Sequence, residues 1–273
     1  MNDIAVLIPY YNDPEGISRT VRSIQEEISI DIIIVDDGSS LLPNWDEIAQ
    51  YASHHTIKTI SLEKNEGIEH ALNAGLKYII SKGYMFTARL DAGDIVVQHR
   101  FIKQRDYLMQ HPIVCLVGTW GRLVDCSGKA LGIRKYPTEH KDIERYMYFF
   151  SGFMHPSVMF RTLAVEQVGM YPTQYKYCED YAFFFKFIKY FKTANLPEVL
   201  MEYEINPRGI SQSKYRIGQF NSIRVIMHNF RWRFVHLFCL SLARRIICLI
   251  LGAKIATWIA LRLGGKNNSD IIS

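Results

Sequence analysis

Three loops rich in carboxylates stand at comparable points of the sequence, each directly after an apolar run. Their sequences are YYND (residues 10–13), DDGSS (residues 36–40) and DAGD (residues 91–94). Asp, Asn and Gly are common in turns, so each loop taken alone could be purely structural. Carboxylates are also the ligands that hard divalent cations prefer, and they accept hydrogen bonds from ribose hydroxyls or a base N–H. The three loops together favour a ligand-binding site.

A fourth acidic group, Glu179-Asp180, opens a Phe-rich run over residues 181–190 that we expect to be helical. Carboxylates at a helix N-terminus are stabilised by the helix dipole, so the pair could be a cap. A carboxylate that reaches a substrate hydroxyl can instead act as a general base. The two roles are compatible, and we favour the base.

Parallel strands are expected to carry the first three loops. Residues 4–9 (IAVLIP) and 32–35 (IIIV) are short unbroken apolar runs, typical of strands covered on both faces. Between them apolar residues recur at helical spacing, and a second helical pattern over residues 68–79 leads to the strand-like residues 84–90. This alternation predicts an α/β fold with a largely parallel sheet. Ligands bind beyond the carboxyl ends of such strands, where the three loops lie.

The rest of the chain is less regular. Helices are expected near residues 98–109 and 139–150, and a strand near residues 113–117. No internal repeat or Pro/Ser-rich linker separates these elements from the first ones. We therefore expect three regions: a first half over residues 1–95, a second half over residues 96–213 that shares its core, and a tail over residues 214–273.

The ordered motifs resemble those of the family 2 glycosyltransferases. They are IPYYND, VDDGSS, NEG followed by ALNAGL, ARLDAGD followed by RFIKQ, HPSVMFR and CEDY, and they run from about residue 4 to residue 213. Each motif is weak, but the ordered set is specific. The resemblance implies a GT-A fold with a mixed central sheet, a nucleotide-sugar donor, a divalent metal ion and inversion at the anomeric carbon. The acceptor would be a hydroxyl of a lipid-linked or growing surface polysaccharide.

The resemblance also implies roles for residues on the first three loops. Asp37 would bind the base or ribose of the nucleotide, with Pro9 and Tyr11 beside it, and Asp91 would contact the ribose or the metal. A divalent cation such as Mn²⁺ or Mg²⁺ neutralises charge on a departing diphosphate. The family usually holds it with Asp-x-Asp, whereas this chain has Gly93 in place of the second Asp and Asp94 after it.

Two arrangements follow for the metal. Either Asp94 replaces the missing ligand, or Asp91 chiefly holds the ribose while diphosphate and water keep the metal. On the acceptor side, the family pattern makes Asp180 the general base, with Glu179 supporting it. His155 and Ser211 match weaker motifs, as contributors to metal or acceptor binding. A His beside a strand is more often structural.

The C-terminal region is basic. Between residues 205 and 269 there is no Asp or Glu, while eleven Lys or Arg residues occur among large apolar side chains. The longest stretch without Lys, Arg or His, residues 246–253, is far shorter than the roughly 20 residues that span a bilayer. We therefore expect amphipathic helices on an anionic membrane surface, with Trp232 and Trp258 as anchors. A helical hairpin packed on the enzyme, or on a partner in a homodimer, is the alternative. Nucleic acid is disfavoured because aliphatic side chains separate the charges.

Composition narrows the location and the function class. Five widely spaced cysteines without a C-x-x-C pair disfavour a disulfide framework and a zinc site. The N-terminal residues lack the pattern of a secretory signal, so we expect a cytoplasmic protein, peripheral on the inner face of the cell membrane. A non-catalytic nucleotide-sugar-binding scaffold of the same fold is the alternative function, because Gly93 weakens the metal motif. A nucleotide-cofactor oxidoreductase is disfavoured, because PYYND follows the first strand instead of G-x-G-x-x-G.

Overall fold

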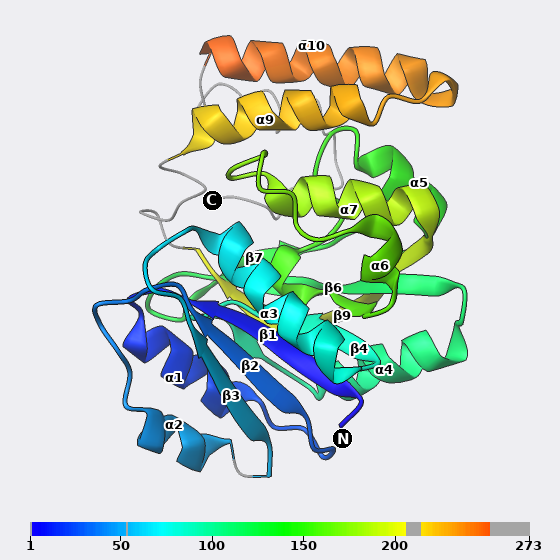
Figure 1. The fold of residues 1–273 in the computed structure, drawn as a ribbon. Coiled ribbons are helices and arrows are strands. Elements are labelled where there is room, and N and C mark those ends of the chain that lie inside the picture. Colours follow the sequence, from blue (N-terminus) through cyan, green and yellow to red (C-terminus); the bar gives the residue numbers. More distant parts are fainter. Residues whose placement is uncertain (1, 53, 206–213, 252–273) are drawn as a thin grey trace.

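A mixed β-sheet forms the centre of the molecule (Figure 1). The computed structural model describes residues 2–52, 54–205 and 214–251, and within these residues nine strands form one sheet. The strands are β1 (Ile4–Tyr10), β2 (Asp31–Asp36), β3 (Thr56–Ser61), β4 (Phe86–Arg89), β5 (Ile95–Val96), β6 (Val114–Val124), β7 (Ala130–Arg134), β8 (Met159–Arg161) and β9 (Lys192–Glu204). The helices are α1 (Pro14–Ser23), α2 (Trp45–Tyr51), α3 (Ile68–Lys82), α4 (Arg100–Gln110), α5 (His140–Tyr146), α6 (Ala164–Val168), α7 (Glu179–Tyr190), α9 (Tyr215–His228) and α10 (Val235–Leu251), with 3-10 turns η1 (His155–Ser157) and η2 (Trp232–Phe234).

The first four strands are parallel, in the spatial order β3-β2-β1-β4. The chain builds outward from β1 to β3, then returns to the other side of β1 to form β4, which leaves a crevice at the carboxyl ends. Tyr10 lies opposite Asp36 in the β1–β2 register, and Leu7 lies opposite Arg89 in the β1–β4 register. The loops that follow these three strands therefore share one edge, as the sequence predicted.

The second part of the sheet is mixed. β8 runs antiparallel to both β4 and β6, while β6 and β9 are parallel and β5 is antiparallel to β9. The α/β class and mixed sheet expected from the sequence are confirmed. The sequence analysis missed β3, α2 and the long strand β9. It also placed the end of the helix near residues 139–150 four residues beyond α5.

Two hydrophobic cores lie on opposite faces of the sheet, because successive strand residues point to opposite sides. Ile4, Val6 and Ile8 of β1 pack with side chains of α1, α2 and α4, whereas Ala5 and Leu7 pack with those of α3, α6 and α7. Helix α3, in cyan in Figure 1, thus covers one face of the parallel strands and α1 covers the other. The sheet edge that bears the loops is fixed from both sides.

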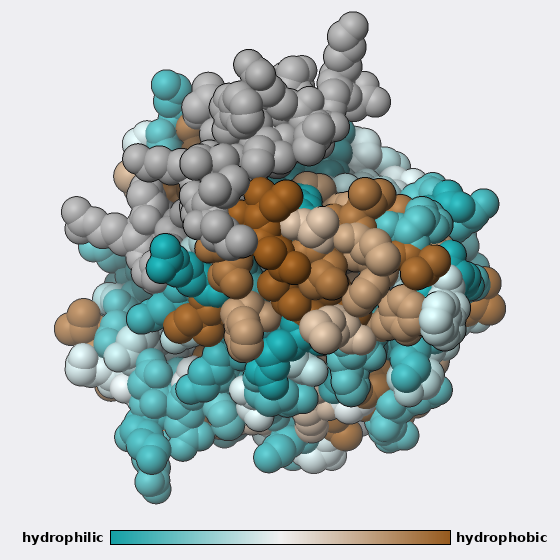
Figure 2. Space-filling model, turned by 90° about the horizontal axis from the view of Figure 1, so that it is seen from above, coloured by the Kyte–Doolittle hydropathy of each residue, from teal (hydrophilic) through white to brown (hydrophobic). Residues whose placement is uncertain are grey.

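Helices α9 and α10 lie side by side, and α9 lies next to α7 (Figure 1). Val225 and Ile226 of α9 belong to the same core as α7, and the buried Arg245 of α10 donates to the Tyr181 hydroxyl. Figure 2 views this face from above and shows apolar side chains gathered there. The exposed apolar residues include Ile217, Phe220, Met227, Leu240, Ile246 and Ile247. Within the described residues, no helix has both the length and the apolar character needed to cross a membrane.

Candidate active site

The loops after β1 and β2 are tied together at the sheet edge. The Asn12 side-chain oxygen accepts from the backbone N–H groups of Ser40 and Leu41, at 2.9 and 2.8 Å, and the Asn12 N–H donates to the Ser39 hydroxyl at 2.9 Å. Asn12 adopts a left-handed backbone, φ 52°, which Asn tolerates. Tyr11 is half exposed beside it. The predicted contact residue Tyr11 therefore stands on the rim, with the ring accessible.

Asp37 holds the segment that precedes α3. Its carboxylate accepts hydrogen bonds from the N–H of Glu66 at 2.8 Å and from the N–H of Gly67 at 3.0 Å. Asp37 is only 4% exposed. Gly67 has φ 105°, a conformation that favours glycine. Carboxylate oxygens have several lone-pair sites, so these bonds leave capacity for a nucleotide. Asp37 nevertheless has a structural role that the sequence did not reveal.

Asp91 forms an ion pair with Arg89, a residue that the sequence analysis did not single out. Their nitrogen and oxygen atoms are 2.5 Å apart, with the Arg89 side chain 1% exposed and the Asp91 side chain 30% exposed. Thr20 of α1 fixes the loop that follows, because its hydroxyl accepts from the Gly93 N–H and donates to the Asp94 carbonyl, each at 2.9 Å. Asp91 is thus an accessible carboxylate on a rigid loop with a buried cation behind it.

Asp94 lies behind this loop and is 3% exposed. One of its oxygens accepts from the Glu204 N–H at 3.2 Å, and the other has no hydrogen-bond partner among the described residues. Burial and the nearby Asp91 charge raise the pKa of Asp94 well above its usual range. A carboxyl that resists ionisation is a poor direct ligand for a hard cation. The role of Asp94 as a metal ligand stays a prediction, and the geometry favours Asp91.

The residues present fit a divalent cation only in part. Within the described ranges, no cluster of three or more His, Cys, Asp or Glu side chains is arranged to hold one. Gly93 has φ 101°, and a side chain at this position would point within 3.8 Å of Asp13 Oδ2. The accessible Asp91 carboxylate is the group that fits a cation, and the donor diphosphate and water would have to supply the other oxygens.

Glu179 and Asp180 form the first turn of α7. Asp180 is partly exposed, and its Oδ1 accepts from the Tyr181 N–H at 2.6 Å. Burial, with a further contribution from the negative charge of Asp91, raises the pKa of Asp180. The η1 turn links the two segments, because its His155 ring packs against Phe184 of α7 and the Arg89 N–H of β4 donates to the carbonyl of Val158, just after η1. That the acidic pair of α7 and the loop after β4 form one site stays a prediction.

Glu179 is more deeply buried than Asp180. Burial, followed by the charges of Asp180 and Glu69, raises the pKa of Glu179 to about 8. Glu69, in the first turn of α3, is 4% exposed, and its carboxylate lies beside Gly67, since a Cβ there would be 2.9 Å from Glu69 Oε2. Glu69 thus lies beside the segment that Asp37 holds, and its negative charge helps to raise the pKa of Glu179. The sequence analysis did not single out Glu69.

His155 lies in the η1 turn beside the site. Its Nε2 is 3.2 Å from the Tyr171 hydroxyl, and its ring packs edge-on against Tyr171 and Phe184. Burial, with a smaller effect of Arg89, lowers the pKa of His155 well below its usual range, so that the ring is neutral. These contacts favour the structural reading, and a role in metal or acceptor binding stays a prediction. Ser211 lies outside the described residues.

Carboxylate loops at the ends of parallel strands that continue into a mixed sheet are typical of a GT-A transferase. The sequence matches Glycosyl transferase family 2 over residues 5–166, more than half of the chain, and the chain belongs to this family. The resemblance seen in the ordered motifs is confirmed. The protein is a glycosyltransferase.

Two curated relatives illustrate the match. The amylovoran biosynthesis glycosyltransferase AmsE of Erwinia amylovora is 32% identical over 202 residues, covering 72% of this chain and 74% of the relative. The UDP-Gal:alpha-D-GlcNAc-diphosphoundecaprenol beta-1,3-galactosyltransferase of Escherichia coli is 27% identical over 169 residues, covering 60% of each chain. The match thus spans about three fifths of the length of the second relative.

Solved structures share the fold at low sequence identity. TarS of S. aureus, residues 1–349 in complex with UDP-GlcNAc, superposes with a TM-score of 0.67 at 16% identity, covering 97% of this chain and 77% of that one. The mannosyltransferase PcManGT of Pyrobaculum calidifontis, in complex with GDP-Man and Mn²⁺, gives a TM-score of 0.62 at 15% identity, covering 96% and 79%. At these identities the likeness shows the GT-A fold alone.

Proposed function

We propose that this chain is an inverting glycosyltransferase of surface-polysaccharide biosynthesis. It would move a sugar from a nucleotide sugar to a hydroxyl of a lipid-linked or growing glycan. The observation that carries the proposal is the accessible Asp91 carboxylate, held by the buried Arg89 at the carboxyl end of β4, because such a group suits a cation that binds a donor diphosphate. AmsE, named for amylovoran biosynthesis, and the galactosyltransferase named for a diphosphoundecaprenol-linked acceptor support this choice.

The chemistry follows from the positions of the two carboxylates. Asp180 takes the proton of the acceptor hydroxyl as its oxygen attacks the anomeric carbon. The bond from that carbon to the diphosphate oxygen breaks on the opposite face, and its electron pair leaves with the diphosphate. Asp91, oriented by Arg89, would hold a divalent cation, which absorbs charge developing on the diphosphate. Glu179, uncharged near neutral pH, would support Asp180 without competing for the proton.

We assign regions of the chain to these steps. Residues 1–95 would form the nucleotide-sugar-binding half, with Pro9, Tyr11 and Asp37 at the nucleotide. Residues 96–213 would form the acceptor and catalytic half, and residues 214–273 a basic tail. PcManGT, whose structure contains Mn²⁺, supports a divalent metal as cofactor.

The tail would place the enzyme on the inner face of the cell membrane. Four of its basic residues are engaged with the rest of the chain: Arg231 and Arg233 pair with Glu144, Arg244 donates to the Phe149 carbonyl, and Arg245 donates to the Tyr181 hydroxyl. The exposed apolar residues of α9 and α10 face outward instead (Figure 2). Sedimentation of the full chain with anionic vesicles would support the membrane, whereas a tight homodimer that ignores vesicles would support the alternative.

A donor panel tests the proposed activity. The chain is incubated with UDP-, GDP- and dTDP-sugars, with Mn²⁺ or Mg²⁺, and release of the nucleoside diphosphate is measured together with binding. We expect metal-stimulated hydrolysis of at least one donor. Binding without hydrolysis would instead support the non-catalytic scaffold. If no donor is bound or hydrolysed, both functions are excluded.

Asp37 gives a prediction that concerns both the nucleotide and the fold. Asp37→Ala should weaken binding of the donor nucleotide by about tenfold or more, because a charged hydrogen bond is lost. It should also lower the free energy of unfolding by about 1–3 kcal/mol, since the Glu66 and Gly67 N–H groups lose their acceptor. Calorimetry and thermal unfolding measure the two effects.

Asp31→Asn is the matched control for this variant. Asp31 accepts from Tyr84 and Asn2 at the opposite end of β2, far from the loops. The Asp31→Asn variant should be less stable than the wild type and should bind the nucleotide with unchanged affinity. If Asp37→Ala also binds the nucleotide with unchanged affinity, Asp37 has only a structural role.

A further inference from the structure

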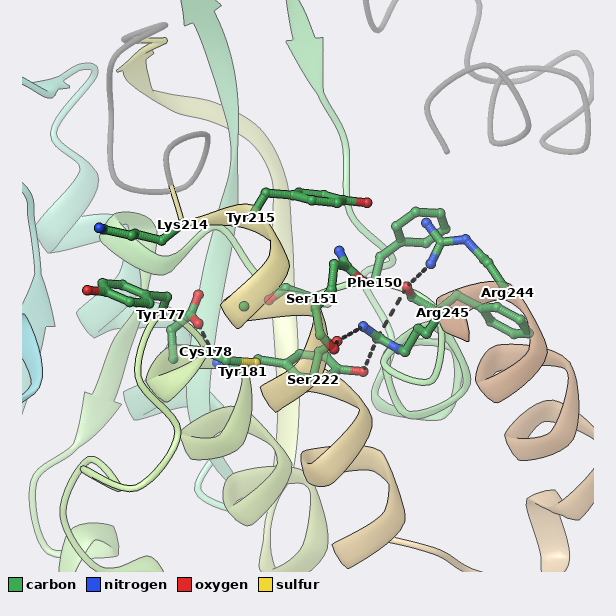
Figure 3. A pocket seen from close by; sticks show the side chains of 14 residues that line it. Phe150, Ser151, Tyr177, Cys178, Tyr181, Lys214, Tyr215, Ser222, Arg244 and Arg245 are labelled. Carbon is green, nitrogen blue, oxygen red and sulfur yellow. Dashed lines mark hydrogen bonds between the residues drawn. The ribbon is translucent and has the colours of Figure 1, made fainter. Parts of the chain in front are cut away.

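A cavity of about 290 Å³ opens next to Asp180, on the side formed by α9 and α10 (Figure 3). Its walls come from residues 149–151, the start of α7 and the two C-terminal helices, and three of the lining residues are basic: Lys214, Arg244 and Arg245. Asp180 is the acidic residue on the wall. The volume is near the lower end of small-molecule sites, which begin at roughly 300 Å³. Three cations and one carboxylate give the cavity a positive balance.

The two arginines have neutral partners. Arg245 is 5% exposed and donates to the Ser222 hydroxyl at 2.5 Å and to the Tyr181 hydroxyl at 2.8 Å, and its Nε has no partner among the described residues. Arg244 donates to the Phe149 carbonyl at 2.9 Å and lies 4.3 Å from the centre of the Phe150 ring. Figure 3 shows both guanidinium groups reaching the cavity from α10.

The contrast with Arg231 and Arg233 is informative. These two arginines of the same region pair with the buried Glu144, whereas within the described ranges neither Arg244 nor Arg245 has a carboxylate at ion-pair distance. Burying a cation without a counter-ion is costly. An anion that entered the cavity would supply the missing charge, and Arg is suited to binding phosphate.

We propose that this cavity binds the phosphate group of a lipid-linked acceptor, a diphosphate that joins the accepting sugar to its lipid. The assignment rests on the proposed function, because Asp180 must meet the acceptor hydroxyl. The donor diphosphate belongs at Asp91, so an anion beside Arg244 belongs to the other substrate. The aromatic side chains of Phe149, Phe150 and Tyr215 line the same cavity and suit the start of a lipid chain next to the phosphate.

Calorimetry with octyl diphosphate tests the cavity directly. The full chain is saturated with the nucleoside diphosphate that the donor panel selects, so that the donor site is filled. We expect octyl diphosphate to bind, and Arg244→Gln to weaken it about tenfold or more, as for loss of a charge-assisted contact. Arg216→Gln is the matched control, because Arg216 is an exposed residue of α9 that does not line the cavity. This variant should change the affinity for octyl diphosphate by about twofold or less.

Three further ligands and one further variant keep the proposal open to refutation. Inorganic diphosphate should bind more weakly, and equal affinity would assign the cavity to a free anion. Octyl glucoside should not bind, and affinity equal to that of octyl diphosphate would assign it to an apolar chain. Binding of octyl diphosphate only when the nucleoside diphosphate is left out would place the probe in the donor site. If Arg244→Gln fails to fold, the exposed Lys214→Gln should weaken binding, and an unchanged affinity would overturn the proposal.

The proposed function fails separately from this inference. If the panel shows no donor binding or hydrolysis, the glycosyl-transfer reaction is wrong, and octyl diphosphate binding can still be measured without nucleotide. If donors are hydrolysed but octyl diphosphate does not bind, only the acceptor phosphate site is wrong.

Discussion

Asp180→Asn is expected to bind the donor normally and to lose transfer by about 10²- to 10⁴-fold, the range for removal of a positioned general base. The amide keeps the shape of the side chain and can still accept from the Tyr181 N–H, but it cannot take a proton from a hydroxyl. Single-turnover transfer and donor affinity are the two measurements. Because burial raises the pKa of Asp180, wild-type transfer should also rise with pH through that raised value, and the variant should lack this dependence.

Glu179→Gln is the control for this result. The pKa of Glu179 is raised to about 8, so this residue is mostly uncharged at pH 7 and a neutral amide resembles it. We expect Glu179→Gln to lower the rate of transfer by about tenfold or less. Equal losses in the two variants, or near wild-type transfer in Asp180→Asn, would return the acidic pair to a helix-capping role.

Asp91→Asn should reduce metal-stimulated turnover by about 10²- to 10³-fold, as expected for one electrostatic group in a transition state. The substitution removes the accessible carboxylate that fits a cation and leaves the buried Arg89 without its counter-ion. Stability should therefore fall as well, and thermal unfolding separates the two effects. Turnover is measured over a range of Mn²⁺ and Mg²⁺ concentrations and in excess chelator.

Asp94→Asn distinguishes the two metal arrangements. Burial raises the pKa of Asp94, so an uncharged amide should be tolerated, with metal stimulation retained. Loss of metal stimulation in this variant would make Asp94 the replacement ligand for the missing Asp. Gly93→Asp is a poorer test, because φ at Gly93 is 101° and any side chain there is strained. Full wild-type activity in excess chelator would show that the reaction needs no metal ion.

The sequence predicts the parallel half of the sheet well because its strands are buried on both faces. The apolar runs of β1 and β2 reflect this burial directly. β3 was missed because it is an edge strand with alternating partial exposure, and β9 because Pro197 and Glu198 interrupt its apolar pattern. Exposed or interrupted strands are defined by their neighbours, which a local pattern does not contain.

The site was predictable where it follows a motif and not where it depends on packing. Asp37 and Asp91 follow β2 and β4 at the sheet edge as the motifs indicated, and Asp180 lies in the first turn of α7, while their roles stay predictions. Arg89 stands only two residues before Asp91, but the motif does not show that its side chain is buried and pairs with that carboxylate. Glu69 belongs to the first turn of α3, and only tertiary packing brings its charge near Glu179. The tail shows the same limit. The sequence predicts basic amphipathic helices for the tail, but it does not show that Arg244 and Arg245 of α10 donate to the Phe149 carbonyl and to the Tyr181 hydroxyl.

The stereochemistry of the first hydrolysis product tests inversion most directly. The donor selected by the panel, carrying its sugar as the α-anomer, is hydrolysed by the full chain in an NMR tube with water in place of the acceptor. Asp180 deprotonates a nucleophile on the face opposite the diphosphate, so the β-anomer should appear first and the α-anomer only later, by mutarotation. Initial release of the α-anomer would mean retention and would contradict the mechanism.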